Sequence, residues 1–191
     1  MVNLIRLLLI YFLFILGLVN CSETIYDNTD PNIKMNAGVY LYKEQFLTGI
    51  IKSYIPALQE TELASFRNGI QHGEYKIITR DGKLLQKMDF RNGKKEGFSK
   101  AWYHNGKLRA FAEFKNGEYI NDRIDYFDNS QVASYEKYSE NSKIQVVKKW
   151  YRNGKIYMNI SFKEDGSSYG LPGSKLCDPI KKTKEKELIT K

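Results

Sequence analysis

The feature that most constrains this chain is a short motif that recurs at a constant interval. An aromatic residue, a basic residue, Asn and Gly follow one another three times without gaps, at 66–69, 90–93 and 114–117, which is a 24-residue period. The same step reaches further aromatic residues on both sides, and this aromatic column comprises Tyr42, Phe66, Phe90, Phe114, Tyr138 and Phe162. A fixed period of this length indicates repeats that are each one supersecondary unit.

Three further columns keep the same period. The second column comprises Tyr54, Ile78, Trp102, Tyr126 and Trp150, which are aromatic except for Ile78. A glycine column comprises Gly49, Gly73 and Gly97, and its fourth position is Asn121. A turn column comprises Gly82, Gly106, Ser130 and Gly154. Because independent columns share one period over residues 42–162, we expect an array of similar units rather than an ordinary mixed domain.

Each unit is predicted to be a β-hairpin. Apolar and polar residues alternate after each turn, as in the segment 107–114, and a period of two places one face of a strand against a core. We expect type I′ turns at 81–82, 105–106 and 153–154, because Asp-Gly and Asn-Gly tolerate positive φ at both central positions. The longer stretches 69–73 and 93–97 are expected to close the opposite end of the array.

The pattern F-x-N-G-x-x-x-G, followed by W/Y-Y-x-N-G-K-L, resembles the MORN-repeat variant of the YwqK-type proteins, which are often labelled antitoxins. The match is closest over 66–116 and becomes degenerate towards 42 and 162. The resemblance implies an all-β fold, an elongated antiparallel sheet of stacked 24-residue hairpins, here over 39–165. It implies an interaction scaffold without a common enzymatic activity. We expect the aromatic columns to stack and hold the units together: Trp102, Tyr126 and Trp150 in one stack, Phe90, Phe114 and Tyr138 in another.

The N-terminus predicts export. Residues 1–20 have the form of a signal peptide, whose apolar core at 7–19 is too short for the roughly 30 Å of a membrane span. The segment 18–21 resembles the bacterial lipobox, which implies acylation of Cys21, although Asn20 stands where Gly, Ala or Ser is usual. The expected location is a bacterial membrane, as a lipoprotein on the outer membrane, its periplasmic face or the cell surface. The alternative is an ordinary signal peptide, with Cys21 free to pair with Cys177.

The segments on either side of the array differ from it in composition. Residues 21–38 are polar and predict a flexible tether, and residues 166–191 predict a basic, mostly disordered tail. The net charge is +8, but basic and acidic residues are interleaved along the chain. We therefore interpret the lysine cluster at 181–186 as a solvated tail and expect no nucleic-acid partner.

No pattern of catalytic residues stands out. The two histidines, His72 and His104, lack Cys or His neighbours at ligand spacing, so we expect no metal. No cofactor motif occurs, and we expect a protein that is not an enzyme. Three aromatic residues fall outside the columns, on the otherwise polar face of their strands, and form a candidate binding face: Phe111, Tyr135 and Tyr157.

Three functions remain open at this point. The first is a lipid-anchored scaffold that holds a protein or cell-envelope partner. The second is an immunity protein that neutralises a toxin, as the family label implies. The third is a glycan-binding module that uses its exposed aromatic residues.

Overall fold

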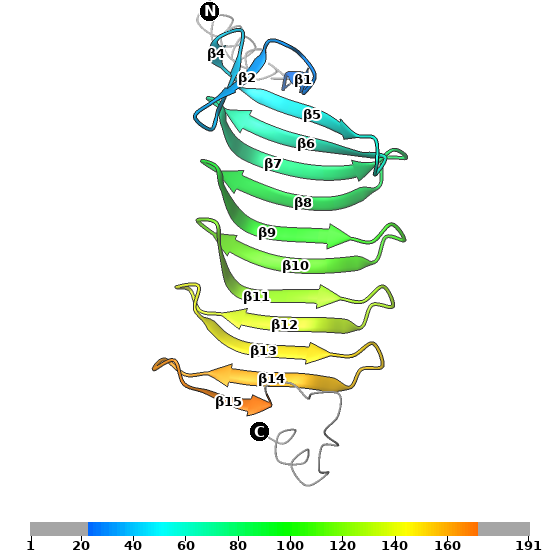
Figure 1. The fold of residues 1–191 in the computed structure, drawn as a ribbon, viewed down its shortest axis with the longest axis vertical. Helices are drawn as coiled ribbons and strands as arrows, with labels where there is room; N and C mark the ends of the chain where they lie inside the picture. The colour runs from blue at the N-terminus through cyan, green and yellow to red at the C-terminus, as the bar shows by residue number, and fades with distance from the viewer. Residues whose placement is uncertain (1–22, 172–191) are drawn as a thin grey trace, which may run out of the picture.

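The computed structural model describes residues 23–171, and every regular element in this part is a β-strand (Figure 1). The strands form a twelve-stranded sheet and a three-stranded sheet. The large sheet contains β1 (Ile25–Asp27), β5 (Gly49–Ile55), β6 (Glu60–Arg67), β7 (Ile70–Thr79), β8 (Leu84–Arg91), β9 (Lys94–Trp102), β10 (Leu108–Lys115), β11 (Glu118–Tyr126), β12 (Val132–Tyr138), β13 (Ile144–Trp150), β14 (Ile156–Phe162) and β15 (Ser168–Leu171). The small sheet contains β2 (Ile33–Asn36), β3 (Val39–Tyr42) and β4 (Gln45–Phe46). The expected all-β array of stacked hairpins is confirmed.

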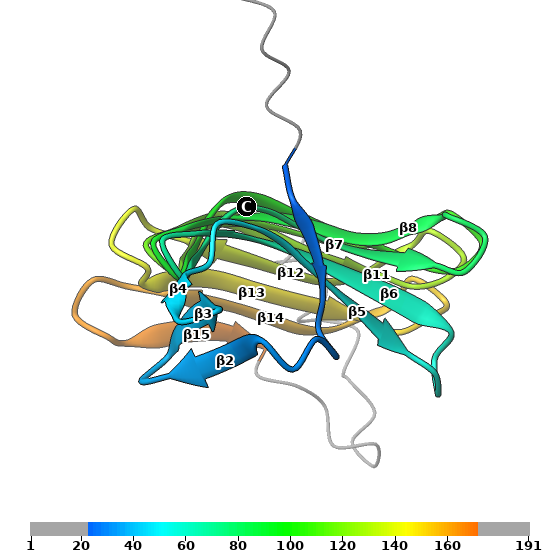
Figure 2. The ribbon, with the colours of Figure 1, turned by 90° about the horizontal axis from the view of Figure 1, so that it is seen from above.

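The large sheet is one continuous meander. From β5 to β15 each strand pairs antiparallel with the next in the chain, and β1 adds a parallel strand at the β5 edge. Hydrogen bonds therefore join neighbouring hairpins as well as the two strands within a hairpin. Seen down its long axis, the sheet is arched, and β2, β3 and β4 lie beneath one side of the arch (Figure 2). We call the face towards these strands the inner face and the opposite face the outer face.

The two ends of the hairpins use different turns, and the sequence-based assignment of turn types was wrong. Asn68 and Gly69 both have positive φ, 51° and 76°, and they link directly paired residues of β6 and β7. This is the two-residue type I′ turn. At the other end only Gly82 has positive φ; its N–H donates to Thr79 O, and the Thr79 N–H donates to Lys83 O. That pattern is a three-residue loop with a type I turn. An Asx-Gly dipeptide fits both turns, and strand register selects between them.

The glycine column supplies bulges. The pairing of β7 with β6, of β9 with β8 and of β11 with β10 shifts register close to Gly73, Gly97 and Asn121. Each of these residues has positive φ, at 95°, 73° and 54° respectively. A bulge with a left-handed residue bends its strand and increases the local twist. The recurrence of this residue in successive units therefore contributes to the arch.

Hydrogen bonds between turns also recur from one unit to the next. The N–H of the glycine in each type I′ turn donates to a carbonyl of the preceding unit: Gly69 to Leu47 at 2.7 Å, Gly93 to Gln71 at 2.8 Å and Gly117 to Lys95 at 2.9 Å. The asparagine before each of these glycines donates its backbone N–H to a side chain of the preceding unit, that of the residue directly after the carbonyl acceptor. These pairs are Asn68 to Thr48, Asn92 to His72 and Asn116 to Glu96. The type I′ turns thus connect neighbouring units.

A single cross-strand row forms much of the core. This central row runs along the inner face through Ile51, Ala64, Tyr75, Met88, Ser99, Ala112, Arg123, Glu136, Val147 and Ile160. Five of the nine buried apolar residues belong to this row: Ile51, Ala64, Met88, Ala112 and Val147. A one-layer sheet buries little else, so the centre of the inner face is its best-packed region.

The flanking segments are more ordered than expected. Within 21–38, where we expected a flexible tether, β1 joins the large sheet and β2 the small one. The Tyr40 and Phe66 ring centroids lie 4.7 Å apart, so the small sheet packs on the inner face. Within 166–191, β15 pairs with β14. The expected signal peptide at 1–20 and the rest of the basic tail lie outside the described residues.

Candidate functional site

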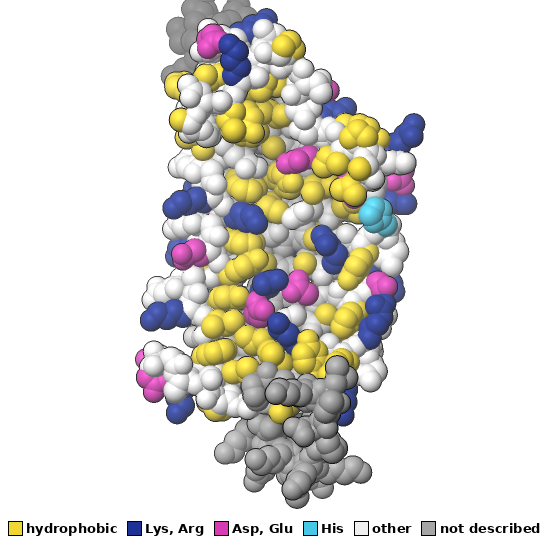
Figure 3. Space-filling view, viewed as in Figure 1, with side chains coloured by type: hydrophobic (Ala, Val, Ile, Leu, Met, Phe, Trp, Pro, Cys, Tyr) yellow, Lys and Arg dark blue, Asp and Glu magenta, His cyan; other side chains and the backbone are white. Residues whose placement is uncertain are grey.

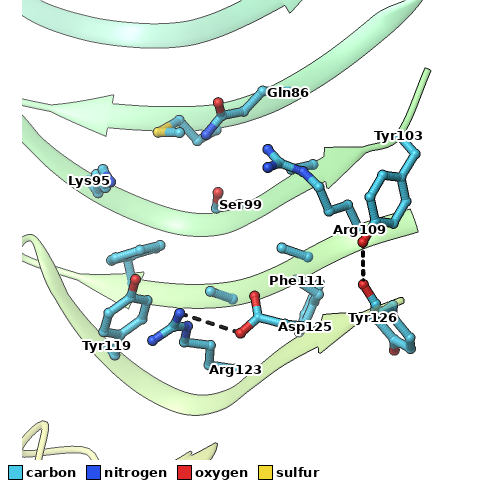
Figure 4. Close-up of a pocket in the computed structure, with 15 residues that line it drawn as sticks. Gln86, Lys95, Ser99, Tyr103, Arg109, Phe111, Tyr119, Arg123, Asp125 and Tyr126 are labelled. Atoms are coloured by element: carbon cyan, nitrogen blue, oxygen red, sulfur yellow. Dashed lines mark hydrogen bonds and ion pairs between the residues drawn. The ribbon is translucent and has the colours of Figure 1, made fainter. Parts of the chain in front are cut away.

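The candidate site is a hollow of about 300 Å³ in the inner face, between β8 and β11 (Figure 4). We call it the central hollow. Its floor consists of small residues, because Ala112 lies opposite Ser99, and Ala110 opposite Ala101, on the neighbouring strands β10 and β9. Four adjacent small side chains leave a depression that larger neighbours surround.

Tyrosine side chains border the hollow at both ends. At one end, the Tyr103 hydroxyl donates to the backbone carbonyl of Tyr126 at 2.6 Å (Figure 4). At the other end the Phe114 and Tyr119 ring centroids are 4.5 Å apart, and Tyr119 stacks on Tyr138 at 5.4 Å. The aromatic column therefore packs through interleaved tyrosines. Among the described residues, no ring pair joins Trp102, Tyr126 and Trp150, so the expected stacking of this column is absent.

A charged cluster lies on the β11 side of the hollow. Arg123 Nη1 is 3.1 Å from Glu136 Oε2, and Arg123 Nη2 is 3.4 Å from Asp125 Oδ2. The Tyr138 hydroxyl donates to Glu136 Oε2 at 2.8 Å. Burial, and then the Glu136 carboxylate, raise the pKa of Tyr138 to about 12. Burial lowers the pKa of Arg123, but Asp125 and Glu136 outweigh it and the net shift is upward. The cluster is a satisfied ion-pair network.

A second hollow adjoins the first. It has a volume of about 360 Å³ and includes Ile77, Leu85 and Trp102 in its lining. Three residues line both hollows: Gln86, Tyr103 and Arg109. In the space-filling view, hydrophobic side chains follow the long axis of the sheet, with basic and acidic side chains among them (Figure 3).

The charged cluster was missed at the sequence level, although the repeat register contains a signal for it. Arg123 lies one repeat period after Ser99, and Asp125 lies one period after Ala101, where Ser99 and Ala101 both belong to the hollow floor. Glu136 likewise follows Ala112 by one period. Charged residues that replace small residues in a core-facing column therefore identify the place where one unit departs from its neighbours.

Of the candidate binding face predicted from the sequence, Phe111 is among the residues that line the central hollow (Figure 4), but strand register directs its side chain to the outer face. Phe111 and Tyr135 share one cross-strand row on the outer face, separated by Ile124. The Phe111 ring stacks on Phe98, which is 56% exposed, at 5.6 Å. Tyr135 donates to Asp122 Oδ1 at 2.8 Å.

Tyr157 lies apart from that pair, next to the β13–β14 turn, where its ring packs on Tyr151 at 4.5 Å. The structure therefore brings together two of the three predicted residues. Cys21, the predicted lipid-attachment residue, lies outside the described residues.

Other chemistry is not evident in residues 23–171. In this range, no group of three or more His, Cys, Asp or Glu side chains is placed to hold a metal ion. His72 contacts the Asn92 turn, and His104 Nε2 is 3.7 Å from Glu60 Oε1. In the same range no helix is long and apolar enough to cross a bilayer.

Comparisons with known proteins do not identify a family. No family model and no curated protein matches the chain. One similar solved structure is described as the crystal structure of the GtfA/B complex bound to UDP and GlcNAc. It has 13% sequence identity and a TM-score of 0.31, over 51% of this chain. The chain spans only 22% of the length of that protein.

Proposed function

We propose that this protein is an exported, lipid-anchored scaffold that holds a partner protein against the inner face of its arched sheet. The observation that carries the proposal is the pair of adjoining hollows on a concave sheet face, lined by tyrosines, alanines and charged side chains. Repeat arrays often use such concave surfaces for binding. The resemblance to the MORN-repeat variant supports a scaffold, and an immunity protein would be a special case in which the partner is a toxin.

Site-directed photocrosslinking in native membranes tests the scaffold. A photoreactive amino acid at Gln86 lies on the inner face at the border of both hollows, and one at Lys87 lies on the outer face. We expect one discrete adduct from the Gln86 position and none from the Lys87 position. Equal labelling from both positions, or no adduct at all, would contradict the proposal.

The anchor is proposed from the lipobox resemblance and has its own test. Mass spectrometry of the mature protein should show a diacylglyceryl modification on Cys21. The substitution Cys21→Ala should release the protein from the membrane fraction, because the proposed anchor then has no thiol to carry it. A disulfide between Cys21 and Cys177 in the mature protein would instead exclude acylation of Cys21.

The outer face offers a second candidate function. The stacked rings of Phe98 and Phe111 expose an aromatic surface of the kind that packs against sugar rings. Binding on a glycan array that Phe111→Ala abolishes, and that Tyr157→Ala leaves unchanged, would support glycan binding at this pair. Equal loss in both variants would point to a general loss of structure.

A further inference from the structure

We propose that the two hollows form one groove, the inner groove, which binds an extended acidic peptide segment of a partner protein through Arg109. The inference rests on the proposed scaffold function and names the chemistry of its partner. The inner groove comprises the central hollow and the second hollow, which share Gln86, Tyr103 and Arg109.

Arg109 occupies the position best suited to anchor a ligand. The pairing of β10 with β9 shifts register between Leu108 and Ala110, so Arg109 is the extra residue of a bulge. Bulges commonly re-aim a side chain beside a binding site. Here the equivalent positions in neighbouring units are Leu85 and Ala133, so the charge is particular to this unit.

The guanidinium of Arg109 is available to a ligand. Arg109 is exposed and takes part in none of the ion pairs among residues 23–171. An arginine stays protonated at any physiological pH and presents five donors, in a planar fork that matches a carboxylate. A bidentate pair of this kind gives both affinity and orientation.

The charge around the groove selects an acidic ligand. Lys95 adds a second cation to the lining, with its Nζ 5.0 Å from the centroid of the Phe114 ring. The acidic Asp125 and Glu136 are both paired with Arg123. The second hollow also includes Glu60, whose side chain is only 13% exposed and lies 3.7 Å from His104 Nε2. In the central hollow, the charges without an ion pair among residues 23–171 are therefore those of Arg109 and Lys95, and both are positive.

The floor of the central hollow favours a peptide over a sugar. Its four side chains offer three methyl groups and the single hydroxyl of Ser99. A sugar ring seated on this floor would meet only one hydrogen-bonding side chain there, Ser99, because the other polar side chains of the lining, such as Gln86 and Tyr103, lie outside the floor. An apolar peptide side chain would instead exclude water from the alanine methyl groups.

The length of the groove sets the length of the ligand. The hollows extend from Glu60 of β6 to Asp125 of β11. Six strands at a spacing of about 4.8 Å cover roughly 24 Å, which corresponds to about seven residues of extended peptide. The ligand is therefore a short segment with at least one acidic and one apolar side chain.

Fluorescence anisotropy with the full-length protein in detergent micelles tests the inference. The probe is a labelled ten-residue peptide that contains three glutamates and three leucines among serines and glycines. We expect saturable binding that weakens at least tenfold in Arg109→Gln. We expect a similar loss in Ala112→Leu, which fills the floor of the hollow. Far-ultraviolet circular dichroism of each variant checks that the sheet is intact.

Two controls separate the groove from general attraction to a basic protein. Lys100→Gln removes the same charge on the outer face of the adjacent strand and should change the affinity less than twofold. A peptide with glutamine in place of glutamate should bind at least tenfold more weakly. Equal effects of Arg109→Gln and Lys100→Gln would overturn the inference, and so would Arg109-dependent binding of an oligogalacturonate without binding of the peptide.

The scaffold proposal and the acidic-peptide inference can be contradicted independently of each other. A discrete crosslinked partner at Gln86 that Arg109→Gln leaves unchanged would overturn the acidic-peptide inference and leave the scaffold in place. Absence of any adduct at Gln86, with normal peptide binding, would overturn the scaffold as the role of the groove in the cell.

Discussion

At the scale of the residue, Asn121 shows how a glycine column tolerates a side chain. Its φ of 54° matches the left-handed conformation of Gly73 and Gly97 in the preceding units. Asparagine enters this region more readily than most residues, because its short polar side chain can form a local hydrogen bond. Here the Asn121 Nδ2 donates to Glu113 Oε2 at 2.8 Å. Asn121 therefore keeps the left-handed backbone conformation of the glycine column, although it is not a glycine.

We predict that Asn121→Ala destabilises the protein by about 1–2 kcal/mol, because alanine lacks the polar side chain whose hydrogen bond supports the left-handed conformation. Urea denaturation followed by circular dichroism measures the effect. Lys137→Ala is the control, since Lys137 is exposed on the neighbouring strand β12 and has an ordinary φ. Equal effects of the two substitutions would show that the backbone at Asn121 is not strained.

We predict that Tyr75 and Tyr138 lose their hydroxyl protons only at high pH, because both have a raised pKa. Burial, and then the Glu62 carboxylate, raise the pKa of Tyr75 from 10 to about 12, and burial followed by Glu136 does the same for Tyr138. The folded state holds these protons more tightly than the unfolded state. Their stabilising contribution is therefore complete below about pH 10 and is lost as the pH rises towards 12.

The ultraviolet absorbance of tyrosinate measures this directly. In the folded protein we expect a late step near pH 12, and each of Tyr75→Phe and Tyr138→Phe should reduce its amplitude. A titration curve without a late step would contradict the burial of these hydroxyls.

At the scale of the element, the type I′ turns join units as well as strands. Gly69 lies under β3, where a Cβ at this position would meet Val39 Cγ1 and lie 2.6 Å from Tyr40 O. Gly106, in the three-residue loop between β9 and β10, has a similar φ of 82° but nothing within 4 Å of such a Cβ. The two glycines thus share a backbone requirement, while only Gly69 has a steric one.

We therefore predict that Gly106→Ala costs about 1 kcal/mol through its left-handed φ alone. Gly69→Ala should cost roughly 2–5 kcal/mol, because overpacking adds to the same strain. Denaturant unfolding of both variants measures the difference. Equal costs would mean that β3 does not pack on the turn as described.

The unit after β12 lacks this connecting turn. Its loop from Ser139 to Lys143 has positive φ only at Ser142, and the Ser139 N–H donates to Lys143 O. The loop is therefore of the three-residue kind. This accounts for the weakening of the sequence pattern towards residue 162, because the Asn-Gly dipeptide is required only where two consecutive residues have positive φ.

At the scale of the whole molecule, the arch is a single layer with a cap at one end. The small sheet covers the N-terminal end of the inner face, and Leu47, which follows β4, is only 1% exposed. Repeat arrays need terminal units that cover the exposed end of their core. The segment 23–48 therefore acts as a structural cap rather than as a spacer.

We predict that Leu47→Ala lowers the free energy of unfolding by about 2–5 kcal/mol, the usual cost of removing a fully buried leucine. Leu58→Ala, at a leucine that is 59% exposed, should change it by about 0.5 kcal/mol or less. Thermal unfolding of both variants in the same detergent provides the comparison. A small effect at Leu47 would show that the cap is dispensable.

The array was predictable from the sequence because its physical requirements recur in register. The constant spacing of Phe66, Phe90 and Phe114 located the hairpins, and the alternation within 107–114 assigned strands. The assignment of type I′ turns failed because Asn105-Gly106 and Asn92-Gly93 look alike as dipeptides. Only their φ values and strand register distinguish them.

The sequence by itself determined that this protein is a β-meander of repeated hairpin units, because period-two alternation and turn glycines act locally. Only the tertiary structure decided which face is concave, and therefore that Ser99, Ala101, Ala110 and Ala112 meet as the floor of a hollow. It also decided that Arg123 forms ion pairs while Arg109 has none within residues 23–171, since that depends on neighbours from other strands. Local patterns specify strands and turns, whereas a binding groove arises from how bulges and cross-strand register curve the whole sheet.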